Sequence, residues 1–137
     1  MIDPDVIAGK AGIVARCLDR IHTVTQGNPS AISTFDTEDV VVLNLQRAIQ
    51  ACMDMMMHVV TEENLGMPAT MGDGFVALAG TGLIDRSLAA ELKKMVGFRN
   101  IAVHEYDEID PEMLKGILTH HLTDLDQFAS TMIQKFG

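Results

Sequence analysis

The sequence predicts an all-α protein, an antiparallel bundle of four long helices and one short helix. Apolar residues recur every three or four positions along most of the chain, which is the spacing of an amphipathic helix. No segment shows the strict alternation of a half-buried strand. Glycine and proline interrupt the pattern at a few places, so long helices are joined by short loops and neighbours must run antiparallel.

The first two long helices are expected on either side of a polar loop. The first covers roughly Asp3 to Gln26, and the stretch Gly27-Asn28-Pro29-Ser30 ends it because these residues favour turns. Asp36 is the expected N-cap of the second helix, and Gly66 and Pro68 stop that helix. The apolar stripes are Val14, Cys17, Leu18, Ile21 and Val24 in the first helix, and Val42, Leu45, Ile49, Cys52, Met56 and Val59 in the second.

A short helix and a third long one are expected next. Gly72-Asp73-Gly74 is expected to form a turn, and the apolar segment Phe75 to Ala79 a helix of about two turns. Asp85 or Ser87 is placed to cap the following helix, because their side-chain oxygens can accept from its first amides. Leu88, Leu92, Met95 and Val96 share the buried face of that helix.

The last helix is expected to begin at Asp110-Pro111. Aspartate is a favoured N-cap, and proline is the residue best tolerated at the first helical position. An uninterrupted apolar pattern then predicts one helix that runs to about Lys135, with Leu114, Ile117, Leu118, His121, Leu125 and Phe128 on one face.

Composition sets limits on the class of protein. A chain of 137 residues with 47% hydrophobic and 21% charged residues is expected to fold as one domain, residues 1–137. The longest uncharged stretches are too short to span a membrane and no signal peptide is recognised, so a cytoplasmic protein is expected. The two cysteines, Cys17 and Cys52, are expected to be small buried hydrophobes in a reducing compartment.

The net charge of −9 opposes non-specific attraction to nucleic-acid phosphates. Any contact with nucleic acid must therefore be local. Candidate residues for a local basic surface are Arg47, Arg86, Lys93 and Lys94.

Chemically active side chains gather between Phe98 and Asp107. Arg99, Asn100, His104 and Tyr106 place a guanidinium, an amide, an imidazole and a phenol within eight residues. Arg99 and His104 differ by roughly 140° around an unbroken helix, so one chain does not aim both at a single small group. Either the helix is distorted or two copies of the chain meet.

Arginine and histidine together suit phosphoryl transfer without a metal. A neutral imidazole can take a proton from a 2′-hydroxyl or return one to a leaving oxygen. A guanidinium holds a phosphate and stabilises the charge that grows on it in the transition state. Asn100 can orient either group. The acidic run Asp107-Glu108-Ile109-Asp110 is interpreted as loop and cap, not as a metal site.

These residues also carry a resemblance. Arg99, His104 and Tyr106 match the R-x4-H-x-Y pattern of the HepT-like branch of the HEPN superfamily, and the flanking segments Met95 to Asn100 and Val103 to Asp107 are similar to that branch as well. A weaker similarity begins near Asp39 and extends to the last helix.

The resemblance implies an all-α dimer whose motifs face each other, and a metal-independent endoribonuclease that acts as a toxin and needs no cofactor. Arg99 and His104 would be catalytic, Asn100 would support them, and cleavage would leave a 2′,3′-cyclic phosphate. The implied partners are a second copy of the chain, an RNA substrate and a minimal nucleotidyltransferase (Mnt) antitoxin. That antitoxin would silence the toxin by adenylylating Tyr106.

Several plainer interpretations stay open. Arg99 and His104 can belong to a salt-bridged helix end, with Glu105, Asp107 and Glu108 nearby. The chain can equally be a non-catalytic helical subunit that binds a nucleotide or a nucleotidyltransferase, a role that its acidic charge favours. Of the remaining features, Asp54 and His58 are expected to form a simple surface pair, the methionines Met53, Met55, Met56 and Met57 are expected at an oligomer interface, and His22, His120 and His121 are expected to be incidental.

Overall fold

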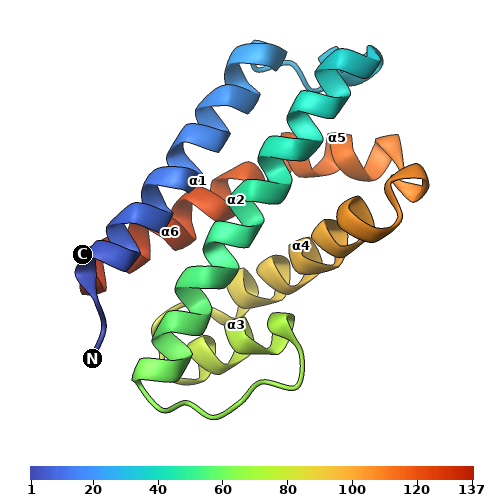
Figure 1. Cartoon of the computed structure of the whole chain (residues 1–137). Coiled ribbons are helices and arrows are strands. Elements are labelled where there is room, and N and C mark those ends of the chain that lie inside the picture. The colour runs from blue at the N-terminus through green and yellow to red at the C-terminus, as the bar shows by residue number, and fades with distance from the viewer.

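The computed structural model describes residues 1–32 and 34–137, and it confirms the all-α bundle (Figure 1). Helices cover most of the chain, and the described residues contain no strand. The elements are α1 (Pro4–Thr25), the 3₁₀ helix η1 (Pro29–Ser33), α2 (Phe35–Glu62), α3 (Met71–Gly80), α4 (Arg86–His104), the 3₁₀ helix η2 (Tyr106–Glu108), α5 (Pro111–His120) and α6 (Leu122–Phe136).

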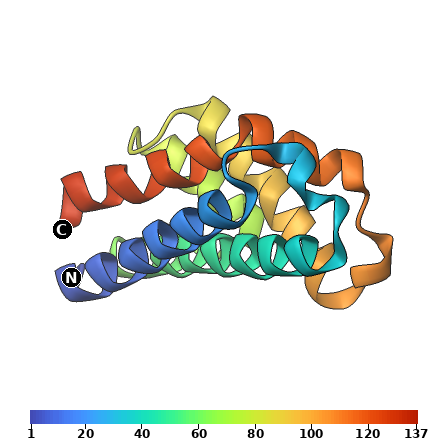
Figure 2. The same ribbon diagram turned by 90° about the horizontal axis from the view of Figure 1, so that it is seen from above.

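The two longest helices, α1 and α2, lie side by side and antiparallel (Figures 1 and 2). Helix α6 packs mainly against α1, and α3 packs mainly against α4. The N- and C-termini lie near each other at one end of the bundle in both views. None of the described helices combines the length and the apolar character that a membrane crossing requires.

Helix α2 is the central helix, because it packs against α1, α3, α4 and α6. For this reason Met53, Met55 and Met56 are all buried in the core of this chain, and only Met57 is partly buried. A methyl group at Gly74 of α3 would clash with the Met56 sulfur, so the helices approach closely there. The prediction that these methionines lie at an oligomer interface is therefore wrong for Met53, Met55 and Met56, because helices of the same chain bury them.

The start of α2 differs from the prediction by two residues. Thr34 is the N-cap, and its hydroxyl accepts a hydrogen bond from the Thr37 amide at 3.3 Å. Asp36 instead lies in the first turn, where its charge favours the positive end of the helix dipole. Either residue type is a good cap, so the sequence alone does not choose between them.

The start of α3 also lies earlier than expected. Gly72, Asp73 and Gly74 are helical and do not form a turn, because the Thr70 hydroxyl caps the helix by accepting from the Asp73 amide at 3.2 Å. Gly72 and Gly74 are both buried. Their small size lets the helices come close together, and they do not form a turn. At the start of α4 the N-cap position is Asp85, one of the two predicted residues, but its side chain makes no capping hydrogen bond.

The single last helix that the sequence predicts is divided at His121 into α5 and α6. It begins as expected, with the Asp110 carboxylate accepting from the Glu112 amide at 2.9 Å. His121 has a non-helical backbone, and its Nδ1 lies 2.9 Å from Asp124 Oδ2 and 3.5 Å from Glu91 Oε2 of α4. His121 is thus the point where the broken helix is attached to α4, and the view that it is incidental is wrong.

Both cysteines are free and buried, as predicted. Burial raises the pKa of the Cys17 and Cys52 thiols, because a thiolate is poorly solvated in the core. They act as packing residues, and neither has the lowered pKa of a reactive thiol.

Candidate functional site

The polar residues of the predicted site lie on the C-terminal half of α4 and in the turn that follows it. Arg99, Asn100 and His104 belong to α4, and Tyr106 begins η2. The opposite face of this part of α4 is apolar and buried through Met95, Phe98 and Ala102. Burial of that face turns the polar edge of the helix outward.

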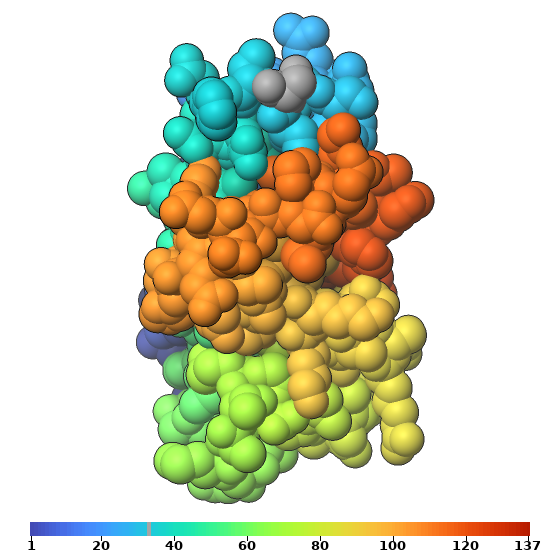
Figure 3. Space-filling view, turned by 90° about the vertical axis from the view of Figure 1, so that its right-hand side faces the viewer, coloured from blue at the N-terminus to red at the C-terminus, as the bar shows by residue number. Residues whose placement is uncertain are grey.

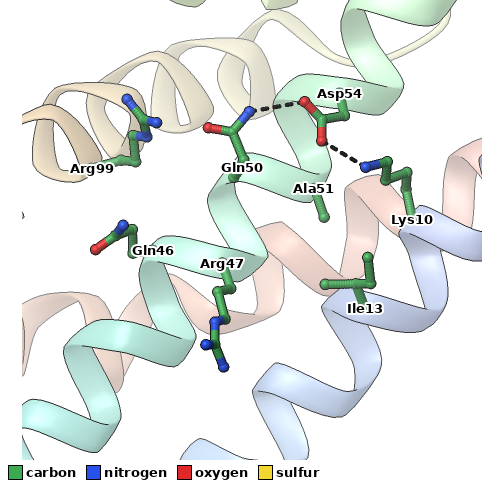
Figure 4. Close-up of a pocket in the computed structure, with 8 residues that line it drawn as sticks. All are labelled: Lys10, Ile13, Gln46, Arg47, Gln50, Ala51, Asp54 and Arg99. Carbon is green, nitrogen blue, oxygen red and sulfur yellow. Dashed lines mark hydrogen bonds and ion pairs between the residues drawn. The ribbon is translucent and has the colours of Figure 1, made fainter. Parts of the chain in front are cut away.

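Arg99 is half-buried and borders a cavity of about 310 Å³ between α1, α2 and α4 (Figure 4). One guanidinium nitrogen, Nη1, donates to Asn100 Oδ1 at 3.2 Å. The Nε atom is buried and has no hydrogen-bond partner among the described residues. A buried donor without a partner is unfavourable, so this guanidinium retains the capacity to bind an anion.

His104 is the last residue of α4 and is exposed. It does not border the cavity that Arg99 borders. Within the described residues no hydrogen bond joins the two side chains, and on a regular helix they differ by roughly 140°. Their meeting across a pair of chains stays a prediction.

Tyr106 is held by a contact that the sequence analysis did not find. Its hydroxyl donates a hydrogen bond to Asp39 Oδ1, at the beginning of α2. Figure 3 shows the turn after α4, in orange, against the beginning of α2, in cyan. Partial burial, the hydrogen bond to Asp39 and the negative charges of Asp39 and Glu38 raise the pKa of Tyr106 to about 12. This contact ties the turn that follows His104 to α2.

The raised pKa of Tyr106 has a measurable consequence at high pH. Tyr106 is the only tyrosine and the chain has no tryptophan, so the near-ultraviolet absorbance of tyrosinate reports this residue alone. We expect a titration midpoint near pH 12 in the wild type and a lower one in Asp39→Asn. Because the folded-state pKa exceeds the ordinary value, the contact stabilises the protein below about pH 10 and is lost as the pH rises toward 12.

The matched control for that titration is Asp36→Asn, which removes a carboxylate from the same turn of α2 without touching the hydroxyl of Tyr106. Its midpoint should stay close to that of the wild type. Equal midpoints in Asp39→Asn and the wild type would contradict the contact.

Asp54 and His58 do not pair with each other, so the predicted surface pair is wrong. The Asp54 carboxylate accepts from Lys10 Nζ at 2.9 Å and from Gln50 Nε2 at 2.8 Å. His58 Nε2 accepts from the backbone amide of Asp3 at 2.9 Å. Both residues thus attach α1 to α2, a use that local spacing on one helix cannot reveal.

Of the residues proposed for a local basic surface, Arg47 is the one that borders the Arg99 cavity. Lys93 pairs with Asp73 at 2.9 Å, and Lys94 with Glu91 at 3.4 Å. Lys10, which lies on α1 and is not among the residues predicted for a basic surface, reaches the same cavity from the other side. No local signal identifies Lys10, since the tertiary packing of α1 on α2 brings it there.

Within the described part of the chain, one group of side chains has the arrangement of metal ligands: Glu91, His121 and Asp124. Contacts within the fold already engage these groups, since Lys94 Nζ pairs with Glu91 at 3.4 Å and His121 Nδ1 lies 2.9 Å from Asp124 Oδ2. Their position at the break between α5 and α6 accounts for them structurally. They lie outside the segment from Arg99 to Tyr106.

Known proteins with similar sequences are described as HepT-like ribonucleases. A family model described as ribonuclease HepT-like matches residues 14–132. The chain is 40% identical over 124 residues to the mRNA nuclease HepT of Shewanella oneidensis, a match that covers 90% of this chain and 93% of that protein. It is 27% identical over 114 residues to the tRNA nuclease HepT of Aphanizomenon flos-aquae, covering 82% of this chain and 78% of that protein.

A solved structure with a similar fold is that of the tri-AMPylated HEPN toxin of Shewanella oneidensis in complex with the MNT antitoxin. The TM-score is 0.86 at 40% sequence identity, and the match covers 93% of this chain and 96% of that toxin. The similarity therefore includes the whole bundle and the segment that carries the polar residues.

Proposed function

The chain belongs to the ribonuclease HepT-like family, and from this premise we propose that it is the ribonuclease toxin of a toxin–antitoxin pair. The observation that carries the proposal is the half-buried Arg99 guanidinium, whose buried Nε has no hydrogen-bond partner in the described part of the chain, on the same helix as an exposed imidazole at His104. The family relatives are named as nucleases of two RNA classes, mRNA and tRNA. Residues 1–137 act as one domain in this proposal.

The proposed reaction is an intramolecular transesterification at one phosphodiester of the RNA chain. The 2′-hydroxyl attacks the adjacent phosphorus as the imidazole of His104 accepts its proton. The bond from phosphorus to the 5′-oxygen then breaks, and the resulting imidazolium returns the proton to that oxygen. The products are a 2′,3′-cyclic phosphate and a 5′-hydroxyl. Arg99 stabilises the negative charge on the non-bridging oxygens in the transition state, and Asn100, whose side-chain oxygen accepts from Arg99, keeps that guanidinium oriented.

The proposed site is shared by two copies of the chain. Arg99 and His104 differ by roughly 140° around a regular helix, so in this proposal a complete site combines Arg99 of one protomer with His104 of the other. A two-fold axis would then create two such sites from one interface. The reaction needs no metal, because the imidazole moves the proton and the guanidinium balances the charge.

The proposed silencing is the adenylylation of Tyr106 by an Mnt antitoxin. The hydroxyl attacks the α-phosphate of ATP, pyrophosphate leaves, and the proton is lost from the oxygen that now donates to Asp39. The added phosphodiester carries a negative charge beside Asp39 and Glu38, so it cannot keep the present contact. This proposal is supported by the solved structure of a relative with 40% identity, a tri-AMPylated HEPN toxin in complex with MNT antitoxin.

The experiment that tests the nuclease proposal uses the purified chain, single-stranded RNA and excess EDTA. We expect cleavage that persists in EDTA and produces fragments with 2′,3′-cyclic phosphate ends. RNA that stays intact without a chelator, while the chain still binds the nucleotidyltransferase, would favour the second candidate, a non-catalytic helical binding subunit. The net charge of −9 is the observation that favours this alternative.

A further inference from the structure

The cavity beside Arg99 has the composition of an anion site. Six polar side chains define it, and we call them the Arg99 groove: Lys10 of α1, Gln46, Arg47, Gln50 and Asp54 of α2, and Arg99 of α4. We propose that the Arg99 groove binds backbone phosphates of the RNA next to the bond that is cut. This proposal rests on the proposed nuclease function. It specifies where the RNA substrate binds outside the R-x4-H-x-Y motif.

The charge of the groove is opposite to that of the whole protein. Three of the ten lysines and arginines border it, but only one of the nineteen aspartates and glutamates, in a chain of net charge −9. A positive cavity in a negative protein attracts an anion locally and keeps other polyanions away from the remaining surface. The negative charges that would repel RNA therefore lie mostly on the surface outside the groove.

The single carboxylate of the groove is already satisfied. Asp54 accepts from Lys10 on one oxygen and from Gln50 on the other. The guanidinium groups of Arg47 and Arg99 make no ion pair within the described residues, and the Arg99 Nε lacks any partner. Two guanidinium groups without a carboxylate partner provide the strong donors that phosphate oxygens require.

The arrangement fits a chain of phosphates better than a single ion. In Figure 4 the side chains of Arg99, Gln46 and Gln50 lie around the space between α4 and α2, whereas Arg47 extends from α2 away from Arg99, on the side that faces α1. The guanidinium groups thus come from separate helices and face separate parts of the groove. The amides of Gln46 and Gln50 add donors and acceptors, which suit the 2′-hydroxyl of RNA.

The test measures RNA binding in a His104→Ala background, so that the mixed-sequence single-stranded RNA used as the probe stays intact. Arg47→Gln removes one cation of the groove, and its matched control Arg86→Gln removes an exposed arginine at the opposite end of α4. We expect Arg47→Gln to weaken binding roughly tenfold at low salt and to reduce the slope of log affinity against log salt by about 0.7, as loss of one phosphate contact requires. Arg86→Gln should leave that slope unchanged.

A change of opposite sign comes from Asp54→Asn, which removes the only carboxylate of the groove and releases Lys10 for a phosphate. We expect tighter RNA binding, whereas its control Asp126→Asn, on exposed α6 surface, should bind like the parent. Arg47→Lys should recover most of the affinity that Arg47→Gln loses, which separates loss of charge from misfolding.

The results distinguish this proposal from the one on which it rests. If RNA is bound and cut by the unmodified chain, but Arg47→Gln and Asp54→Asn bind like Arg86→Gln and Asp126→Asn, the groove proposal alone is overturned. A chain that neither binds nor cuts RNA overturns both. Opposite shifts for Arg47→Gln and Asp54→Asn, with unchanged controls, support the groove.

Discussion

Replacement of His104 with alanine is expected to slow RNA cleavage by about a hundredfold to ten-thousandfold, because the proton transfers then lose their positioned imidazole. Arg99→Ala should slow the same step by about a hundredfold to a thousandfold, because charge on the phosphate loses a fixed cation. His104 is exposed and Arg99 is half-buried at the edge of a cavity, so neither change removes core packing. Single-turnover cleavage of a labelled RNA, with thermal unfolding in parallel, measures both effects.

Matched controls exist for both substitutions. His120→Ala removes an exposed histidine of α5, and Arg86→Ala removes an exposed arginine of α4, each outside the proposed site. These controls should cut RNA at the rate of the wild type. Cleavage by His104→Ala or Arg99→Ala at the control rate would leave those residues with a structural role, as in the salt-bridged helix end that the sequence also allowed.

Silencing by the antitoxin is expected to disappear completely in Tyr106→Phe. The substitution keeps the ring but removes the oxygen that would attack ATP, so no adenylyl group can be added at this position. The measured quantity is the ratio of RNA cleavage before and after incubation with Mnt antitoxin and ATP, together with the mass of the intact toxin. The wild type should lose activity and gain mass, whereas Tyr106→Phe should change in neither respect.

Asp39→Asn is a useful companion to Tyr106→Phe, since it keeps the hydroxyl and changes only the group that accepts its proton. It should still be adenylylated. An adenylyl group found on Tyr106→Phe after the same incubation would place the modification on another residue and remove the proposed role of Tyr106.

The sequence predicted those parts of the fold that follow from local rules. Helical periodicity gives the all-α class, and the aspartate and proline at Asp110-Pro111 mark the start of the last helical segment correctly. The break at His121 could not be predicted, because no glycine or proline marks it and its partner Glu91 lies on another helix. The burial of Met55 and the adjacent Met56 likewise depends on the central position of α2, which tertiary packing decides.

In the candidate site, too, some features follow from the local sequence and others depend on tertiary packing. The types and spacing of Arg99, Asn100, His104 and Tyr106 could be taken from one short segment of sequence. The contact of Tyr106 with Asp39 spans 67 positions, and Lys10 reaches the cavity from α1, so neither carries a local signal. The angular separation of Arg99 and His104 on a regular helix is the reason for proposing a shared site.

The shared site is tested most directly by combining two inactive chains. Arg99→Ala and His104→Ala are produced together with different affinity tags, and the mixed dimer is purified through both tags. If each site takes Arg99 from one protomer and His104 from the other, one of the two sites in this dimer is intact, and about half of the wild-type activity should return. A mixed dimer as inactive as its two parents would show that the residues act within one protomer, and would contradict the account.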